Sequence, residues 1–117
     1  MKNAIAYYRQ ASTEDGETGI NEQRDAVIEF ANGHELRITM EFIDNGISGL
    51  TANRPGLTDL ISHIEDDTNG EIDAVVVRDI ARIGRSPDQI NDFLGIMKAA
   101  KKDLLLANDQ NAEYLPR

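Results

Sequence analysis

The chain has 117 residues, 40% of them hydrophobic, which suits one domain with a real core. It contains no cysteine, so a disulfide framework and a thiolate metal site are excluded. The formal net charge of −9 is unfavourable for binding nucleic acid, because generic affinity for DNA comes from lysine and arginine that neutralise phosphates. Any role on DNA therefore needs a local cluster of arginines, and a further basic module elsewhere.

The apolar stretch before Arg9 is too short for a signal peptide or a membrane span. We therefore expect a cytoplasmic protein that has no membrane partner. Residues 1–117 are expected to form a single domain.

The first part of the chain predicts alternating strands and helices. Residues 3–8 are apolar and aromatic and predict a strand, and the polar, glycine-bearing residues 10–19 predict a long loop. A helix is expected over residues 21–32, with Asn21 as its N-cap. Residues 36–43 alternate between apolar and polar side chains, which predicts a strand with one wet face at the edge of a sheet.

The second part continues the alternation. A loop over residues 44–53 leads to a helix that opens at Arg54-Pro55 and carries an apolar stripe at helical spacing. Residues 72–78 include four apolar residues in a row and predict a strand buried on both faces. Ser86 is expected to cap a third helix, and residues 104–107 predict a fourth strand.

This β-α-β-α-β-α-β order predicts an α/β fold of three layers. We expect a central, mainly parallel four-stranded sheet in the order 2-1-3-4, with right-handed crossovers and helices on both faces. Ligands of such sheets bind outside the carboxyl ends of the strands. The residues that follow those ends are Arg9, Gln10, Ala11, Ser12 and Thr13 after the first strand, Asp44, Ser48 and Arg54 after the second, and Arg78, Asp79, Arg82 and Arg85 after the third.

Several arginines beside a hydroxyl group favour phosphoryl transfer. Guanidinium groups match the oxygens of a phosphodiester bidentately, and removing one such preorganised donor from an active site costs roughly 3–4 kcal/mol. Arginines that neutralise the charge make a metal unnecessary, and we predict no metal and no cofactor. We expect Asp44 and Asp79 to orient the arginines.

Each of these residues also has a simpler interpretation. An arginine in a loop is most often solvated or part of a weak surface ion pair. A serine in a loop, such as Ser12, is usually a turn or cap residue. The expected gathering of four arginines at one edge of the sheet favours the functional interpretation.

Four stretches, which together cover nearly the whole chain, resemble the catalytic domain of the serine recombinases, the family of resolvases, invertases and large integrases. Singly they are weak signals, but their order and spacing are highly specific. They are Tyr7-Tyr8-Arg9-Gln10, Glu22-Gln23-Arg24, the block from Phe42 to Gly49 with Asn53-Arg54-Pro55-Gly56-Leu57, and Val75 to Ser86.

The resemblance implies site-specific DNA recombination without metal or nucleotide cofactor. A serine attacks the DNA backbone, leaving a 3′-hydroxyl and a 5′-phosphoserine link, and strands are exchanged in a synaptic tetramer of two dimers and rejoined. The resemblance also implies that the chain stops before a long dimerisation helix and a DNA-binding domain. It assigns Arg9, Arg54, Arg82 and Arg85 to the scissile phosphate, and Asp44 and Gln23 to supporting roles.

The chain departs from the family pattern at two places. The family nucleophile stands two residues after the motif arginine, and that position is Ala11, with Ser12 next. Either the chain is an inactive variant, engineered or natural, or the loop is shifted by one residue so that Ser12 attacks. The acid that usually precedes the Arg82 position is replaced by Ala81, and Asp79 is a candidate substitute. A different class of function, a non-enzymatic α/β binding or regulatory module, is the alternative.

Overall fold

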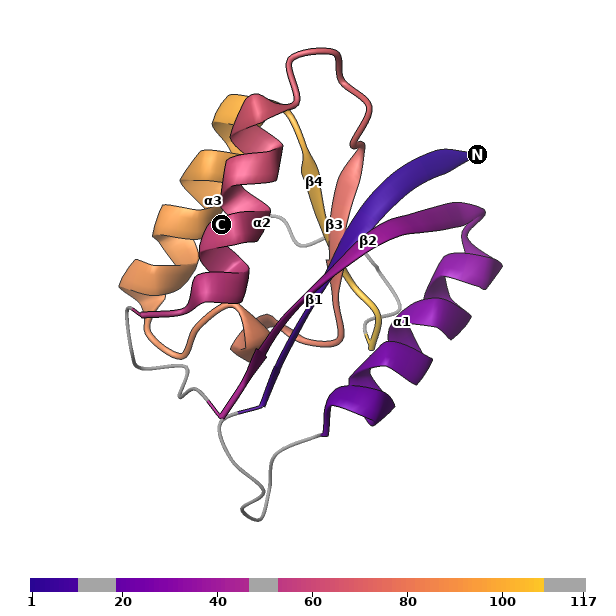
Figure 1. Ribbon diagram of the computed structural model, residues 1–117, viewed down its shortest axis with the longest axis horizontal. Helices are drawn as coiled ribbons and strands as arrows, with labels where there is room; N and C mark the ends of the chain where they lie inside the picture. The colour runs from indigo at the N-terminus through magenta and orange to yellow at the C-terminus, as the bar shows by residue number, and fades with distance from the viewer. Residues whose placement is uncertain (11–18, 47–52, 109–117) are drawn as a thin grey trace.

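The computed structural model of the protein describes residues 1–10, 19–46 and 53–108 (Figure 1). Strands and helices alternate along these residues, with one short 3-10 helix, η1, between the third strand and the last helix. The elements are β1 (Lys2–Gln10), α1 (Ile20–Gly33), β2 (Leu36–Asn45), α2 (Pro55–Asp66), β3 (Ala74–Val77), η1 (Ile80–Arg82), α3 (Pro87–Ala100) and β4 (Asp103–Leu106).

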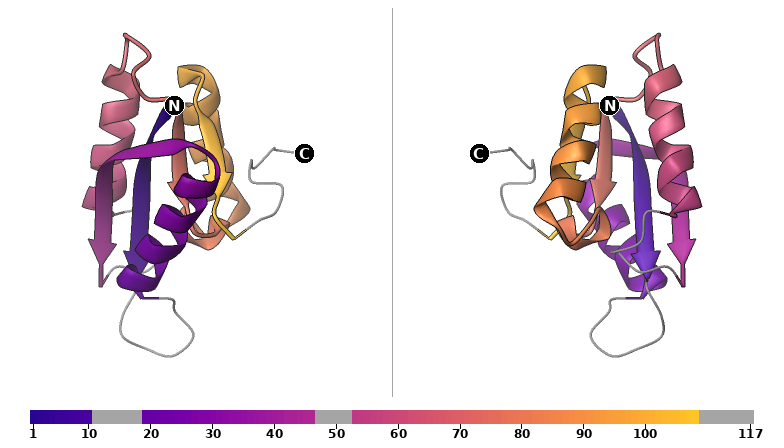
Figure 2. Two further views of the ribbon diagram at one scale, coloured as in Figure 1. Left: turned by 90° about the vertical axis from the view of Figure 1, so that its right-hand side faces the viewer. Right: turned by 90° about the vertical axis from the view of Figure 1, so that its left-hand side faces the viewer.

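The strands form one sheet in the order β2-β1-β3-β4, and each neighbouring pair is parallel. The predicted fold class and strand order are therefore confirmed. Helix α1 covers one face of the sheet and helices α2 and α3 cover the other, which gives three layers (Figures 1 and 2). The arrowheads of the strands point toward the same edge of the molecule, which we call the carboxyl edge (Figure 2).

The central strand β3 is buried along its whole length. It pairs with β1 on one side and β4 on the other, and its side chains alternate between the two helical layers. Val75 and Val77 pack on the side of α2 and α3, whereas Ala74 and Val76 pack on the side of α1. This double burial explains the unbroken apolar run in the sequence. The strand is shorter than the predicted range 72–78.

Strand β2 lies at the edge of the sheet, as predicted, but its apolar residues do not share one face. The register with β1 shifts at Thr39, because Ala4 pairs with Ile38 and Ile5 pairs with Met40. An extra residue of this kind, a β-bulge, turns the following side chains to the opposite face. Leu36 therefore packs under α1, whereas Phe42 packs under α2 and α3.

The helix starts differ in how well local sequence defines them. Ser86 caps α3 in a full capping box with Gln89, as the sequence predicts. The prediction that Asn21 caps α1 is wrong, because the helix begins at Ile20. The first amide of α1, from Ile20, instead donates to Oε1 of Gln10 at 3.2 Å, so a residue at the end of β1 replaces the local cap. In the described ranges no helix combines the length and apolar character needed to cross a membrane.

A buried ion pair ties the chain together at the edge opposite the carboxyl ends of the strands. Lys102 Nζ lies 2.5 Å from Asp67 Oδ2, and the two side chains are 5% and 7% exposed. Asp67 also accepts the backbone N–H groups of Glu71 and Ile72. Burial raises the pKa of Asp67, but the hydrogen bonds from Lys102 and these two amides outweigh burial and hold the pKa below its ordinary value.

We expect Asp67→Asn to lower the free energy of unfolding by roughly 2 kcal/mol at pH 7, because it removes the charge that pairs with buried Lys102. The folded-state pKa of Asp67 is depressed, so its ionised form contributes stability above the unfolded pKa of about 4 and loses that contribution as the pH falls. Urea unfolding at several pH values should therefore show the difference between the two proteins shrinking as the pH falls below about 4. Asp66→Asn, at an exposed neighbour, is the control, and a pH-independent difference for Asp67→Asn would contradict the assignment.

A second prediction concerns the close approach of α2 to β2. A Cβ atom on Gly56 would lie 2.6 Å from the carbonyl oxygen of Ile43 and 3.0 Å from Cγ of Asp44, whereas one on Gly95 in α3 would meet nothing within 4 Å. Alanine favours a helix over glycine by about 1 kcal/mol. Gly95→Ala should therefore raise the free energy of unfolding by about 0.5–1 kcal/mol, and Gly56→Ala should lower it despite the same propensity gain. Equal stabilisation of both variants in urea unfolding would refute the close contact.

Candidate active site

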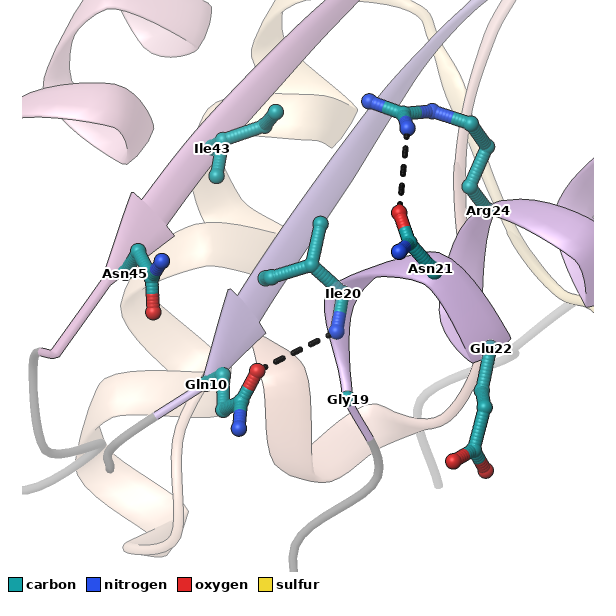
Figure 3. Close-up of a pocket in the computed structure, with 8 residues that line it drawn as sticks. All are labelled: Gln10, Gly19, Ile20, Asn21, Glu22, Arg24, Ile43 and Asn45. Atoms are coloured by element: carbon teal, nitrogen blue, oxygen red, sulfur yellow. Dashed lines mark hydrogen bonds between the residues drawn. The ribbon is translucent and has the colours of Figure 1, made fainter. Parts of the chain in front are cut away.

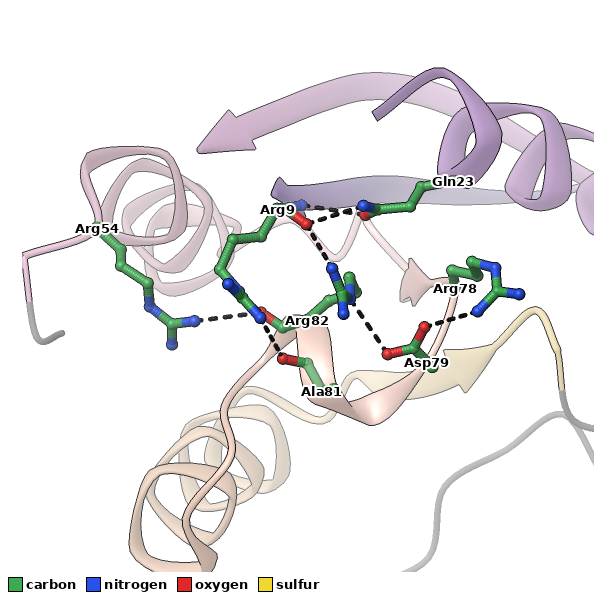
Figure 4. A network of polar contacts seen from close by, with 7 residues as sticks. All are labelled: Arg9, Gln23, Arg54, Arg78, Asp79, Ala81 and Arg82. Atoms are coloured by element: carbon green, nitrogen blue, oxygen red, sulfur yellow. Dashed lines mark hydrogen bonds and ion pairs between the residues drawn. The ribbon is translucent and has the colours of Figure 1, made fainter. Parts of the chain in front are cut away.

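Arg9 lies near the carboxyl end of β1, at the carboxyl edge of the sheet, and is fully buried. The side-chain amide of Gln23 in α1, also fully buried, binds both backbone polar groups of Arg9 (Figure 4). Its Nε2 donates to the carbonyl oxygen of Arg9 at 2.8 Å, and its Oε1 accepts the N–H of Arg9 at 3.1 Å. The two hydrogen bonds tie α1 to the last residues of β1, which ends at Gln10.

The side chain of Arg9 reaches from β1 to η1. Its Nε donates to the carbonyl oxygen of Arg82 at 3.3 Å, and its Nη2 donates to the carbonyl oxygen of Ala81 at 2.9 Å. Arg82 returns the contact, because its Nη1 donates to the carbonyl oxygen of Arg9 at 2.6 Å. Each arginine thus binds the backbone of the other, and the ends of β1 and β3 are held together across the sheet (Figure 4).

Arg54 approaches the same turn from the start of α2. Its Nη1 donates to the carbonyl oxygen of Arg82 at 3.1 Å, and its Nη2 donates to the carbonyl oxygen of Ile83. Arg54 and Arg82 are only 6% and 5% exposed. Three of the four expected arginines therefore meet at the carboxyl edge, although they come from segments more than twenty residues apart in the sequence.

Such a group of guanidiniums gives this edge a local positive charge in an otherwise acidic protein. Arginine stays ionised at any working pH, so the free-energy cost of burying its charge cannot be avoided by loss of a proton. The backbone carbonyl oxygens of η1 offset part of the desolvation cost, because each is a strong acceptor for N–H groups. An anion whose oxygens accept several N–H groups, such as a phosphodiester, suits this edge.

Asp79 is the acid that pairs with arginines of this group. Its Oδ1 lies 3.2 Å from Nε of Arg82, and its Oδ2 lies 2.9 Å from Nη1 of Arg78. The orientation role expected for Asp79 thus has a direct geometric counterpart (Figure 4).

Asp44 has different partners from those expected. Its carboxylate accepts the Tyr7 hydroxyl at 2.7 Å and the backbone N–H groups of Gly56 and Leu57 at 2.7 and 3.0 Å. Asp44 forms no ion pair with an arginine within the described residues; it holds the first turn of α2, on which Arg54 is placed. Burial and then the hydrogen bond to Asp44 raise the pKa of Tyr7 far above its ordinary value, so the phenol stays protonated and acts as the donor.

Of the remaining predicted residues, the structure describes Arg85 but not those in the segments 11–18 and 47–52. Arg85 is exposed, in the turn between η1 and α3, and its backbone N–H donates to Oε1 of Gln89 at 3.2 Å. Ala11, Ser12, Thr13 and Ser48 lie outside the described residues. No cluster of three or more metal-binding side chains is found in the ranges that the structure describes.

Sequence reasoning singled out Tyr7 and Gln10 but assigned no role to either, although both support the site. The buried hydroxyl of Tyr7 needs a partner, and this requirement could have pointed to an acid at the end of the neighbouring strand. Gln10, whose side chain starts α1, carried no comparable signal, because an amide in a polar stretch fits many surface positions. Both side chains act between elements that are distant along the chain.

A pocket of about 550 Å³ opens beside this site, between the ends of β1 and β2 and the start of α1 (Figure 3). Arg24, at its wall, stacks over the ring of Tyr8 at 5.6 Å and pairs with Glu41 at 3.0 Å. The hydrogen bond to Glu41 is the main cause that raises the pKa of Arg24. The pocket is lined by Gln10, Gly19, Ile20, Asn21, Glu22, Arg24, Ile43 and Asn45.

Comparison with known proteins identifies the family to which this architecture belongs. The model of the family described as "Resolvase, N terminal domain" matches residues 4–116. The N-terminal catalytic domain of TP901-1 integrase has a similar structure, with a TM-score of 0.78 and 29% sequence identity over 92% of this chain and 79% of that chain. A search among curated proteins gave no match.

Two more distant structures share the fold. The C-terminal catalytic domain of ISC1926 TnpA, an IS607-like serine recombinase, is 17% identical with a TM-score of 0.77, over 98% of this chain and 71% of that one. A resolvase family site-specific recombinase from Streptococcus pneumoniae is 20% identical with a TM-score of 0.77, over 95% and 80%. With the family match over nearly its whole length, the chain belongs to the family of resolvase N-terminal domains and is a serine recombinase catalytic domain.

Proposed function

We propose that this protein cuts and rejoins DNA by transfer of a backbone phosphoryl group to Ser12 at the carboxyl edge of the sheet. The observation that carries the proposal is the convergence of Arg9, Arg54 and Arg82 on one turn beside the end of β1 at Gln10, two residues before Ser12 in the sequence. Membership of the resolvase family supports DNA as the substrate.

In the proposed reaction, Oγ of Ser12 attacks the scissile phosphorus and loses its proton as the new P–O bond forms. The bond to the 3′ oxygen breaks, and that oxygen leaves as a hydroxyl after taking up a proton. The product is a 5′-phosphoserine. Attack by a 3′-hydroxyl on this phosphorus reverses the step, rejoins the DNA and releases the serine.

The arginines would act on the charge that develops during these steps. The phosphorane-like transition state carries more negative charge on its non-bridging oxygens than the ground state does, and fixed cationic donors stabilise it selectively. Arg9, Arg54 and Arg82, with Arg85 at the rim, are the proposed donors. Gln23 and Asp44 are proposed to support them, by fixing the backbone of Arg9 and the start of α2.

Two exchanged duplexes require four cuts, and each catalytic domain supplies one nucleophile. We therefore propose that the protein acts as dimers that pair into a tetramer on DNA. This arrangement is general in the family, and it keeps the cut ends together while strands are exchanged.

The nucleophile can be assigned with three single variants of the full-length protein. Labelled DNA carrying its recombination site should form a denaturant-resistant adduct with the unchanged protein, and Ser12→Ala should abolish the adduct while Thr13→Ala retains it. An adduct that appears only with Ala11→Ser would instead show that the natural nucleophile position is occupied by alanine and that the unchanged chain is inactive. Absence of an adduct from all four proteins would contradict the proposed reaction.

The net negative charge leads to a separate prediction, about the affinity of the 117-residue chain for DNA. With a net charge of −9, it neutralises few phosphates overall, so its affinity for DNA at physiological salt should be weaker than about 1 μM. Fluorescence anisotropy with site DNA and with an unrelated duplex measures this affinity. Sub-micromolar binding that prefers the site sequence would contradict the view that DNA recognition lies mainly outside this chain.

A further inference from the structure

Asp79 occupies an unusual position for a carboxylate that forms ion pairs. It is the N-cap residue of η1, where an aspartate ordinarily accepts backbone N–H groups of the following turn. Its side chain makes no capping hydrogen bond. Both oxygens are directed instead at guanidinium groups, one at Arg82 and the other at Arg78 (Figure 4).

The contact with Arg82 fixes the orientation of a buried guanidinium. Nε of Arg82 donates to Asp79 Oδ1, and Nη1 donates to the carbonyl oxygen of Arg9. Because the guanidinium is planar and rigid, two partners on different nitrogens determine both its position and its plane. Of these two partners, Asp79 is charged and the backbone of Arg9 is neutral.

Charge adds a second reason for an acid at this place. The Arg82 side chain is 6% exposed and Arg9 is fully buried, so their charges are poorly screened by water. The Asp79 side chain, which pairs with Arg82, is 19% exposed and so is less deeply buried than either arginine. Residue 81, between Asp79 and Arg82 in sequence, is alanine and contributes only its carbonyl oxygen, which accepts Nη2 of Arg9.

Arg78 shares the carboxylate but lies further out. Its side chain is 33% exposed, and as a neighbour in sequence it reaches Asp79 without crossing the site. Loss of Arg78 would leave the Asp79–Arg82 contact in place. The two arginines are therefore unequal partners, and Arg82 is the one whose position affects the site.

We propose that Asp79 is a positioning residue for DNA cleavage, because it holds the Arg82 guanidinium toward the scissile phosphate. This inference rests on the proposed function, since Arg82 must act on a phosphodiester for its orientation to matter. Asp79 itself does not touch the DNA phosphate. It acts through Arg82, and the charge of its carboxylate is essential.

The first experiment needs no DNA. In the 117-residue chain, hydrogen exchange of the Arg82 Nε–H group is measured by NMR. Asp79→Asn, which keeps the shape but removes the charge, should accelerate this exchange by about tenfold or more, because the charge-assisted bond becomes a weaker neutral one. Asp79→Glu should retain slow exchange. Asp92→Asn, at an exposed position of α3, removes the same charge and should leave the signal unchanged.

The second experiment measures the rate of covalent adduct formation at saturating site DNA with the full-length protein. Asp79→Asn should reduce this rate by roughly ten- to a hundredfold with little change in DNA affinity, since misplacement of a catalytic group by about 1 Å can cost a hundredfold. Asp79→Glu should restore much of the rate, and Arg78→Ala should have a smaller effect. Asp79→Asn combined with Arg82→Lys should be no slower than Arg82→Lys alone, because both changes act on one group.

The outcomes separate the two proposals. Cleavage by Asp79→Asn at the unchanged rate, or unchanged exchange of the Arg82 Nε–H group, would overturn the role of Asp79 while leaving the recombinase reaction intact. Independent, multiplicative losses in the double variant would also overturn it. Absence of an adduct with the unchanged protein, alongside accelerated exchange in Asp79→Asn, would instead count against the proposed reaction and leave Asp79 as a purely structural partner of Arg82.

Discussion

The reciprocal contact between Arg9 and the η1 turn is the interaction on which the rest of the site depends. A buried guanidinium left without acceptors would cost several kcal/mol, and the carbonyl oxygens of residues 81 and 82 are among the acceptors that allow Arg9 to be buried at the sheet edge. The η1 turn itself is held by Arg54, at the start of α2, and by the contact that Arg82 makes with β1. The hydrogen bonds that hold the end of β1 against η1 are therefore the same ones that bring Arg9, Arg54 and Arg82 into one group.

Carboxylates complete this arrangement by holding elements in place. Asp44 joins β2 to the start of α2 and so fixes the helix that carries Arg54. Asp67 joins the end of α2 to the segment that leads into β3. Helix α2 is thus held at both ends by an acid that accepts backbone N–H groups. A rigid α2 matters because the reach of Arg54 to η1 depends on where its first turn lies.

The sequence predicts well those features that local patterns determine. The run from Ala74 to Val77 marks a doubly buried strand, and Ser86-Pro87 marks the start of α3, because burial and capping act within a few residues. Prediction from the sequence fails where the local structure depends on a residue far away in the chain. The bulge at Thr39 depends on pairing with β1. Helix α1 starts one residue before Asn21 because Gln10 supplies its cap. The arginines could be selected from their place after the strands, but the carbonyl partners that hold them could not, since any turn offers carbonyl oxygens.

A guanidinium that binds backbone can still bind a phosphate, and Arg54 shows how. In the contacts that the structure describes, Arg54 uses one N–H of Nη1 and one of Nη2 on the carbonyl oxygens of residues 82 and 83. The guanidinium carries further N–H groups, including that of Nε, which point away from these carbonyls because its donors are arranged as a rigid fork. The same planar group can therefore hold η1 with one edge and present donors to an anion with another. Under the proposed function, preorganisation of this kind would let the site bind a phosphodiester without first breaking the contacts that build it.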